Sequence, residues 1–242
     1  MDLLENAIQS IQVGVEDYLA DSNARLLSAA RNIHAGILLL FKEALYRLSP
    51  DGSNGVLIMS KVVPEKRPDG KIVFVGQGTH TVKTAEIQER FKSLGIIADW
   101  KRFDKISRVR NEVEHFYPKI SQDALKGLIS DSFLIIGDFV QSQLKEEPCD
   151  LLGDKTWQAM LQVTEVYEEE QKRCLESLNQ IDWESDALAN GLSELACRDC
   201  GSELLRPLET VESVQEVVLL CSSCGATEPS DSFIPRNLLK FG

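Results

Sequence analysis

Two Cys-x-x-Cys pairs constrain the C-terminal part of this chain more than any other feature. The pairs are Cys197 with Cys200 and Cys221 with Cys224; 20 residues separate them, and a glycine follows each. A two-residue gap lets one tight turn present two thiolates to one ion, and four thiolates suit the tetrahedral geometry of structural zinc. The glycines supply the backbone freedom that such turns need. We therefore expect a four-cysteine zinc ribbon over residues 195–242.

The zinc of such a ribbon is expected to be structural. Four cysteine ligands leave no coordination position for water, and a unit this small depends on its metal to fold. The candidate strands between the pairs are Glu203–Arg206 and Val214–Leu219. A redox dithiol pair is the alternative interpretation of the same motif. We interpret Cys149 and Cys174 as ordinary thiols, and a reducing cytoplasm fits this cysteine pattern better than a disulfide framework does.

Apolar residues recur at helical spacing through most of the chain, which predicts a mainly α fold. Two β-prone runs, Val56–Val63 and Lys71–Val75, interrupt the helices and predict a hairpin insertion. We expect a helical domain over 1–146, an acidic helix and linker over 147–194, and the ribbon and tail over 195–242. The predicted helices cover 2–20, 22–48, 84–94, 100–116, 121–144 and 151–179.

The net charge of −12 is unevenly distributed. Residues 119–196 carry −10, whereas residues 1–118 carry +1. One stretch of the first part has a single acid, Asp104, among five basic residues: Lys101, Arg102, Lys105, Arg108 and Arg110. We expect an anion to bind there. No uncharged apolar run approaches the roughly 18 residues of a membrane span, and the N-terminus lacks the pattern of a secretory signal, so we expect a cytoplasmic protein without a membrane partner.

A polar motif follows this basic stretch on the same predicted helix. Ile106 and Val109 belong to its apolar stripe, whereas Asn111 and His115 share a face turned away from that stripe. Arg110 lies five positions before His115, which is about 140° around the axis, so one helix alone cannot make a compact site from this pair.

This arginine and histidine pair, with the polar Asn111 after the arginine, resembles the signature of the HEPN superfamily of helical bundles. The resemblance implies a HEPN-like domain over residues 1–146 and a homodimer in which two motif helices face each other. It also implies an endoribonuclease without a catalytic metal, acting as a toxin or antiviral effector with an antitoxin or regulatory protein as a further partner. Tyr117 matches a longer form of the motif in which this tyrosine is modified by AMP, although packing before Pro118 explains it equally well.

RNA is a coherent substrate for these residue types, because its 2′-hydroxyl can attack the adjacent phosphate once a base removes its proton. His115 would be that acid or base, since histidine titrates near neutral pH. Arg110 would bind the scissile phosphate and stabilise its transition-state charge. Asn111 would orient the imidazole or contact the phosphate. The residues expected to guide the RNA backbone are Lys101, Arg102, Lys105 and Arg108.

Two alternatives remain open at this point. The first is a noncatalytic HEPN-like module that binds RNA, nucleotide or protein and uses the ribbon for recognition, which the acidic net charge favours. The second is an adaptor protein in which the motif helix only forms the dimer interface. A similar triplet, Arg31, Asn32 and His34, precedes the motif in sequence, but His34 borders an apolar stripe and is expected to have a packing role.

Overall fold

The structure, a computed structural model, describes residues 3–20, 22–115, 122–183, 192, 195–199, 202–209 and 217–229. The chain is mainly helical with two small antiparallel sheets, as predicted. It divides into two compact units, Met1–Glu146 and Glu147–Gly242, which we call unit 1 and unit 2. Among the described residues, no helix combines the length and apolar character needed to cross a membrane.

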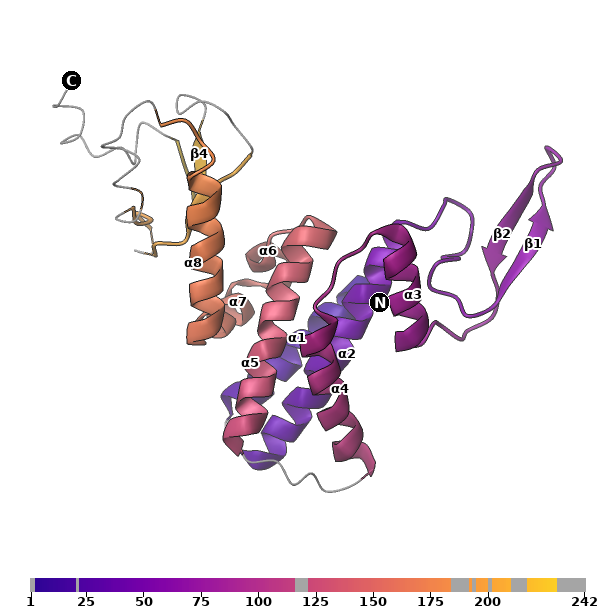
Figure 1. Cartoon of the computed structure of the whole chain (residues 1–242), viewed down its shortest axis with the longest axis horizontal. Helices are drawn as coiled ribbons and strands as arrows, with labels where there is room; N and C mark the ends of the chain where they lie inside the picture. The colour runs from indigo at the N-terminus through magenta and orange to yellow at the C-terminus, as the bar shows by residue number, and fades with distance from the viewer. Residues whose placement is uncertain are drawn as a thin grey trace. The chain divides into compact units, whose positions relative to one another are not determined.

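Unit 1 is organised around one long helix, α2, which packs against α1, α3, α4 and α5 (Figure 1). The predicted positions of these helices are confirmed, with small differences at their ends. Helix α5 continues into a π-helical turn, η1, where an unbroken α-helix was expected. The bounds are α1 Leu3–Leu19, α2 Asn23–Arg47, α3 Thr84–Leu94, α4 Trp100–His115, α5 Gln122–Phe139 and η1 Val140–Leu144.

Glycines allow α1 and α2 to pack at short distance. A Cβ atom at Gly14 would lie 2.6 Å from Ile33, and one at Gly36 would lie 2.5 Å from Ile11. Both distances are too short for a side chain, so each glycine is required by the close approach of the two helices. The neighbouring turn is fixed at Ser22, whose Oγ accepts a hydrogen bond from the Arg25 backbone N–H and caps α2.

The core of unit 1 is a cluster of aromatic rings centred on Phe41 of α2, which is fully buried. The Phe41 ring centroid lies 4.8–5.4 Å from four other rings, in tilted and edge-on arrangements that aromatic pairs prefer. These rings come from three other helices, so the cluster joins α2 to α3, α4 and α5. They are Phe91, Trp100, Phe103 and Phe139.

The hairpin insertion is present, but its first strand lies further along the chain than predicted. Strands β1 (Val62–Lys66) and β2 (Ile72–Gly76) pair antiparallel, with Pro64 opposite Phe74. The predicted strand Val56–Val63 is therefore wrong over most of its length. The tight turn at Arg67–Lys71, closed by the Arg67 N–H to Lys71 carbonyl bond of 2.8 Å, sets the register and places residues 62–66 opposite β2.

The segment before β1 is held to α3 by Arg90. Its guanidinium donates to the carbonyl oxygens of Val56, Leu57 and Met59 at 3.4, 2.6 and 3.1 Å. Met59 also forms an isolated antiparallel bridge with Thr81. These bonds occupy the backbone groups that would otherwise be available for strand pairing, which explains why the apolar run before residue 60 is not a strand.

Unit 2 begins with three helices in place of the single helix predicted over 151–179. They are α6 Pro148–Leu152, α7 Asp154–Leu161 and α8 Thr164–Leu178. Gly153 separates the first two with φ 81° and ψ 147°, a conformation that an α-helix cannot contain. Val163 separates α7 from α8 with an extended backbone, φ −82° and ψ 119°. The apolar periodicity runs across both breaks, so it does not reveal them.

The strands of unit 2 form a three-stranded antiparallel sheet in the order β3–β4–β5. Their bounds are Leu205–Pro207, Val218–Cys221 and Thr227–Pro229, and the third strand was not predicted. The first extends one residue beyond the predicted Glu203–Arg206 and the second extends two residues beyond the predicted Val214–Leu219, of which 214–216 lie outside the described residues. The predicted linker over 180–194 is wrong at Ile181, Trp183 and Leu192, because these side chains are buried in the core of the sheet. The sequence between 184 and 191 lies outside the described residues.

Replacing Phe41 with alanine should destabilise unit 1 strongly. The change would leave a cavity between four rings, and such substitutions of buried aromatic residues cost about 3–5 kcal/mol. Phe74→Ala is the matched control, because the Phe74 side chain is 62% exposed. Urea unfolding followed by circular dichroism measures both variants. Equal effects of the two substitutions would contradict the central role of Phe41.

Candidate functional site

A polar pocket of about 430 Å³ lies between α2, the start of α3 and α4 in unit 1. Most of its polar wall comes from two segments that lie more than 70 residues apart in sequence. Helix α2 contributes Arg31, Asn32 and His34, and α4 contributes Ser107, Arg110 and Asn111. The triplet that resembled a second copy of the motif therefore lies beside the motif arginine in the folded unit.

Arg110 and Asn111 form one wall of this polar pocket. The Arg110 Nη1 donates to Asn111 Oδ1 at 3.1 Å, so the amide oxygen helps to hold the guanidinium. The half-buried Arg110 adds positive charge to a pocket whose other wall holds Arg31. Helix α4 ends at His115, whose side chain lies outside the description, as does Tyr117.

His34 packs between α2 and α4, which confirms its predicted packing role. Its side chain is buried, its ring stacks on Phe103 with centroids 5.1 Å apart, and its Nε2 lies 3.1 Å from Ser107 Oγ. The Ser107 hydroxyl donates its only proton to the Phe103 carbonyl at 2.9 Å. Ser107 Oγ must therefore accept from His34, which places the imidazole proton on Nε2.

Burial, and then the positive charge of Arg110, lower the pKa of His34 from its ordinary value of 6.5 to about 4. The imidazole is therefore neutral at pH 7 and is a weak base. It can contribute hydrogen bonding to the pocket, but its affinity for a proton is too low for general-base catalysis near neutral pH.

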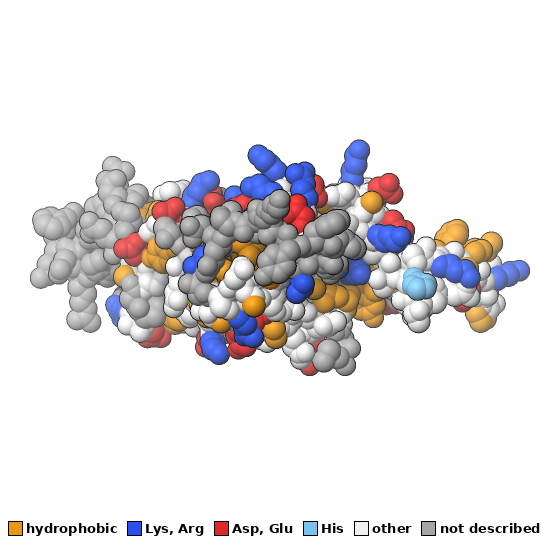
Figure 2. Space-filling view, turned by 90° about the horizontal axis from the view of Figure 1, so that it is seen from below, with side chains coloured by type: hydrophobic (Ala, Val, Ile, Leu, Met, Phe, Trp, Pro, Cys, Tyr) orange, Lys and Arg blue, Asp and Glu red, His pale blue; other side chains and the backbone are white. Residues whose placement is uncertain are grey.

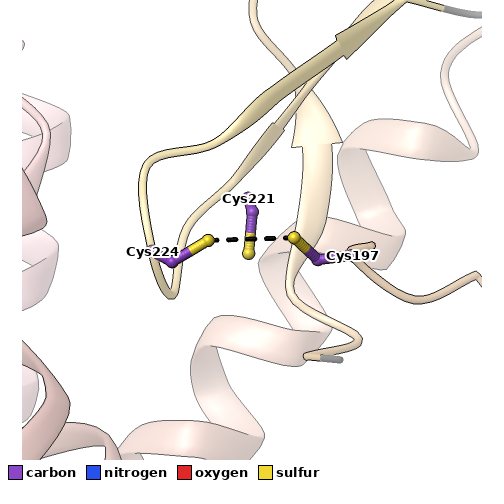
Figure 3. A group of neighbouring side chains, drawn as sticks. All are labelled: Cys197, Cys221 and Cys224. Carbon is purple, nitrogen blue, oxygen red and sulfur yellow. Dashed lines mark hydrogen bonds between the residues drawn. The ribbon is translucent and has the colours of Figure 1, made fainter. Parts of the chain in front are cut away.

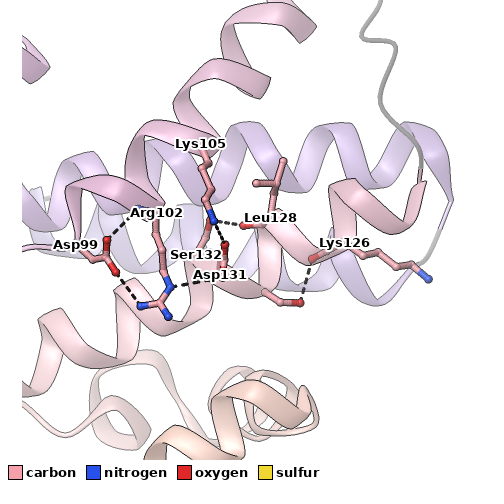
Figure 4. A network of polar contacts seen from close by, with 8 residues as sticks. Asp99, Arg102, Lys105, Lys126, Leu128, Asp131 and Ser132 are labelled. Carbon is pink, nitrogen blue, oxygen red and sulfur yellow. Dashed lines mark hydrogen bonds and ion pairs between the residues drawn. The ribbon is translucent and has the colours of Figure 1, made fainter.

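Two of the four residues expected to guide RNA make ion pairs inside unit 1 (Figure 4). The Asp131 carboxylate of α5 forms ion pairs with Lys105 Nζ at 3.0 Å and with Arg102 Nε at 3.5 Å. Arg102 also contacts Asp99 at 2.8 Å. These carboxylates offset much of the positive charge, whereas Lys101 and Arg108 are exposed on the same helix. The basic stretch is therefore less electropositive than its sequence indicates.

The second candidate site is a cysteine cluster in unit 2. The sulfur atoms of Cys197, Cys221 and Cys224 all lie within 4.8 Å of one another and could bind a metal ion (Figure 3). The Cys197 and Cys224 sulfurs are 3.7 Å apart, which is too far for a disulfide bond. Cys200, the fourth predicted ligand, lies outside the described part of the chain.

Helix α7 braces the turn that carries two of these cysteines. Trp157 Nε1 donates to the Ser222 carbonyl at 2.6 Å, and Gln158 Nε2 donates to Ser223 Oγ at 2.9 Å. From β3, Arg206 Nε contacts Ser222 Oγ at 3.2 Å and its Nη2 pairs with Glu147. The sequence motif identified the cysteines but not these supporting residues, because no spacing rule links them to the turn.

The two remaining cysteines are buried near the same turn. Burial, and then Asp154, whose carboxylate accepts a hydrogen bond from the thiol at 3.0 Å, raise the pKa of Cys149 to about 12. Burial also raises the pKa of Cys174 to about 12. Both thiols are therefore protonated and unreactive at neutral pH, which agrees with their interpretation as ordinary thiols.

Acidification should weaken the fold through His34. Its folded pKa of about 4 lies below its ordinary value of 6.5, so only the unfolded chain takes up this proton between those pH values. The contribution of His34 to stability is complete above pH 6.5 and is lost as pH falls toward 4, by up to about 1.4 kcal/mol per pH unit.

Urea unfolding of the wild type and of His34→Gln across this pH range measures that contribution. The wild type should lose more stability on acidification than the variant does. His80→Gln is the matched control, because it makes the same replacement at an exposed imidazole. Identical curves for wild type and His34→Gln would contradict a buried neutral imidazole.

Comparisons of the chain with protein-family models, with curated proteins and with solved structures gave no match.

Proposed function

We propose that the chain is an endoribonuclease of the HEPN type that works as a homodimer and without a catalytic metal. The observation that carries this proposal is the position of Arg110 and Asn111. They line a positively charged polar pocket on a helix that ends at His115. This arrangement supports phosphate binding at Arg110.

The proposed reaction uses the nucleophile that RNA itself carries. His115 removes the proton of a 2′-hydroxyl, whose oxygen then attacks the adjacent phosphorus, and the bond to the 5′-oxygen of the next nucleotide breaks. A second His115, that of the other protomer, protonates the leaving oxygen. The products are a 2′,3′-cyclic phosphate and a 5′-hydroxyl. Arg110 stabilises the negative charge on the phosphate oxygens, with Asn111 holding its guanidinium.

The homodimer belongs to the proposal because of the helix geometry. Five positions on an α-helix correspond to about 140° around the axis, so one helix alone does not make a compact site from Arg110 and His115. Two α4 helices facing each other would bring the arginine of one copy toward the histidine of the other. The resemblance extends the proposal to a toxin or antiviral effector, with Tyr117 as a modification site and an antitoxin or regulatory protein as a partner.

We also propose that unit 2 binds a structural zinc ion through Cys197, Cys200, Cys221 and Cys224. Zinc–sulfur bonds of about 2.3 Å place the sulfurs of a tetrahedral site about 3.8 Å apart. The 3.7 Å between Cys197 and Cys224 supports this assignment. The hydrogen bonds from Trp157 and Gln158 support it further, because they fix the turn that presents two of the ligands.

One observation favours the second candidate, a noncatalytic module that binds RNA, nucleotide or protein. The ion pairs of Arg102 and Lys105 with Asp131 reduce the charge available for a long RNA strand. A binding module would still use the pocket around Arg110, but it would not need His115. The two candidates therefore differ in the effect of replacing that histidine.

Purified wild-type protein should cleave cellular RNA in excess EDTA and leave cyclic phosphate ends. His115→Ala and Arg110→Ala should each reduce the rate at least about 100-fold, because they remove the acid–base group and the phosphate ligand. Lys92→Ala is the control for loss of one positive charge, since this exposed lysine of α3 is not part of the pocket. Wild-type binding without cleavage would instead support the noncatalytic module.

The metal content of the purified chain tests the zinc proposal. Elemental analysis should find about one zinc per chain in the wild type, and Cys197→Ser should lose it because a four-thiolate site tolerates removal of a ligand poorly. Cys174→Ser is the matched control, since this buried cysteine lies outside the cluster. Retention of zinc by Cys197→Ser would show that this cysteine is not a ligand.

A further inference from the structure

The hairpin of unit 1 exposes apolar side chains on one face. Because side chains alternate along a strand, Val62, Pro64, Ile72 and Phe74 share this face. Ile72 is 69% exposed, Phe74 is 62% exposed and Val62 is 37% exposed. Figure 2 shows orange hydrophobic side chains beside blue Lys and Arg and one pale blue His at one end of the view. Adjacent exposed apolar side chains of this kind often mark a surface that binds another molecule.

The hydrogen-bond ladder shows which backbone groups point away from the hairpin. Bonds from Arg67 N–H to the Lys71 carbonyl and from Gln77 N–H to the Lys61 carbonyl mark both ends of the ladder. Since hydrogen-bonded and non-bonded pairs alternate in antiparallel strands, Ile72, Phe74 and Gly76 direct their backbone groups to the outer edge of β2. Ser53 and Asn54 already bind the N–H and C=O of Gly76. Among the described residues, none bonds to the outward backbone groups of Ile72 and Phe74, so the edge is open at these two positions.

The two edges of the hairpin differ in how well they are protected against pairing. Strand β1 contains Pro64, which lacks an N–H, and the charged Glu65 and Lys66. Proline and charged residues are common protection on edge strands. Strand β2, with the sequence Ile-Val-Phe-Val-Gly, has neither. An added strand would therefore pair with β2.

The charge around the hairpin indicates the chemistry of the added strand. Residues 60–83 carry five lysines and arginines against Glu65 and Asp69. Two positively charged hairpins would repel each other, which disfavours a second copy of this chain at the same edge. An extended RNA strand would match the charge, but it lacks the alternating amide and carbonyl groups that complete a ladder. An acidic peptide satisfies both requirements.

We propose that the outer edge of β2, at Ile72 and Phe74, binds an extended acidic segment of a partner protein as a third strand of the hairpin sheet. The hairpin is preorganised for this role. Arg90 holds the segment before β1, and Asn54 holds the end of β2 at Gly76. The partner's alternate side chains would pack on Ile72 and Phe74, and its carboxylates would meet the lysines around the hairpin. The proposal does not depend on ribonuclease activity.

A displayed library of random 12-residue peptides, selected on the full chain, tests this proposal. The enriched peptides should be acidic with alternating apolar residues. Their affinity should fall about tenfold for Ile72→Pro, which removes one outward N–H without removing a bond between the strands. Val62→Pro is the matched control, because it removes the corresponding N–H from the other edge and should leave affinity unchanged. If Ile72→Pro is misfolded, the peptide affinities of Phe74→Lys and Val62→Lys are compared instead, and only the first substitution should lower affinity.

Hydrogen exchange of the full chain locates the binding site. A selected peptide should slow exchange of the Ile72 and Phe74 amides. The proposal is overturned if no peptide is enriched, if enriched peptides bind the β1 and β2 variants equally, or if exchange slows elsewhere. It is also overturned if a dodecamer of uridine slows the exchange of these amides more than any peptide does, which would indicate an RNA strand. A second copy of the chain would be indicated instead if Phe74→Lys, but not Val62→Lys, converts a dimer to a monomer in light scattering, and this result would overturn the proposal too.

Discussion

The burial of Phe41 among four aromatic rings is the interaction on which the architecture of unit 1 depends. This packing fixes α4 against α2, and Phe103 connects the aromatic cluster to the stacked ring of His34. One and two helical turns beyond Phe103, Ser107 and Arg110 line the pocket with the polar residues of α2. The polar pocket therefore adjoins the hydrophobic core, and His34, which lines the pocket and stacks on Phe103, connects the two.

The sheet of unit 2 is too small to bury a large core by itself. The helices of the unit contribute further hydrogen bonds and apolar contacts. They donate hydrogen bonds to the turn between Cys221 and Cys224, and Trp183, beyond α8, adds a large apolar surface beneath the sheet. The cysteine cluster therefore lies in a larger unit than the short ribbon suggested by the motif. Its supporting residues extend back to Glu147.

Sequence periodicity predicted the helices of unit 1 well, because α2 shows its buried stripe at every turn. It did not predict the breaks at Gly153 and Val163, where apolar spacing continues although the backbone departs from a helix. The cysteine spacing located the three clustered cysteines, since a local motif determines local geometry. The proximity of His34 and Arg110 could not be predicted, because it results from packing between helices that are distant in sequence.

The contact made by Arg90 depends on the identity of the arginine but not on the side chains of the residues that it binds. Its guanidinium binds only main-chain carbonyls, those of residues 56, 57 and 59. Main-chain contacts do not depend on side-chain identity, so this contact by itself places no restriction on which side chains stand at these three positions, although Met59 is restricted by its burial. Position 90 has no such freedom, because a lysine offers a single point of donation in place of a planar fork. As far as this contact is concerned, substitutions are therefore tolerated at the three residues that accept the hydrogen bonds and not at position 90, which donates them.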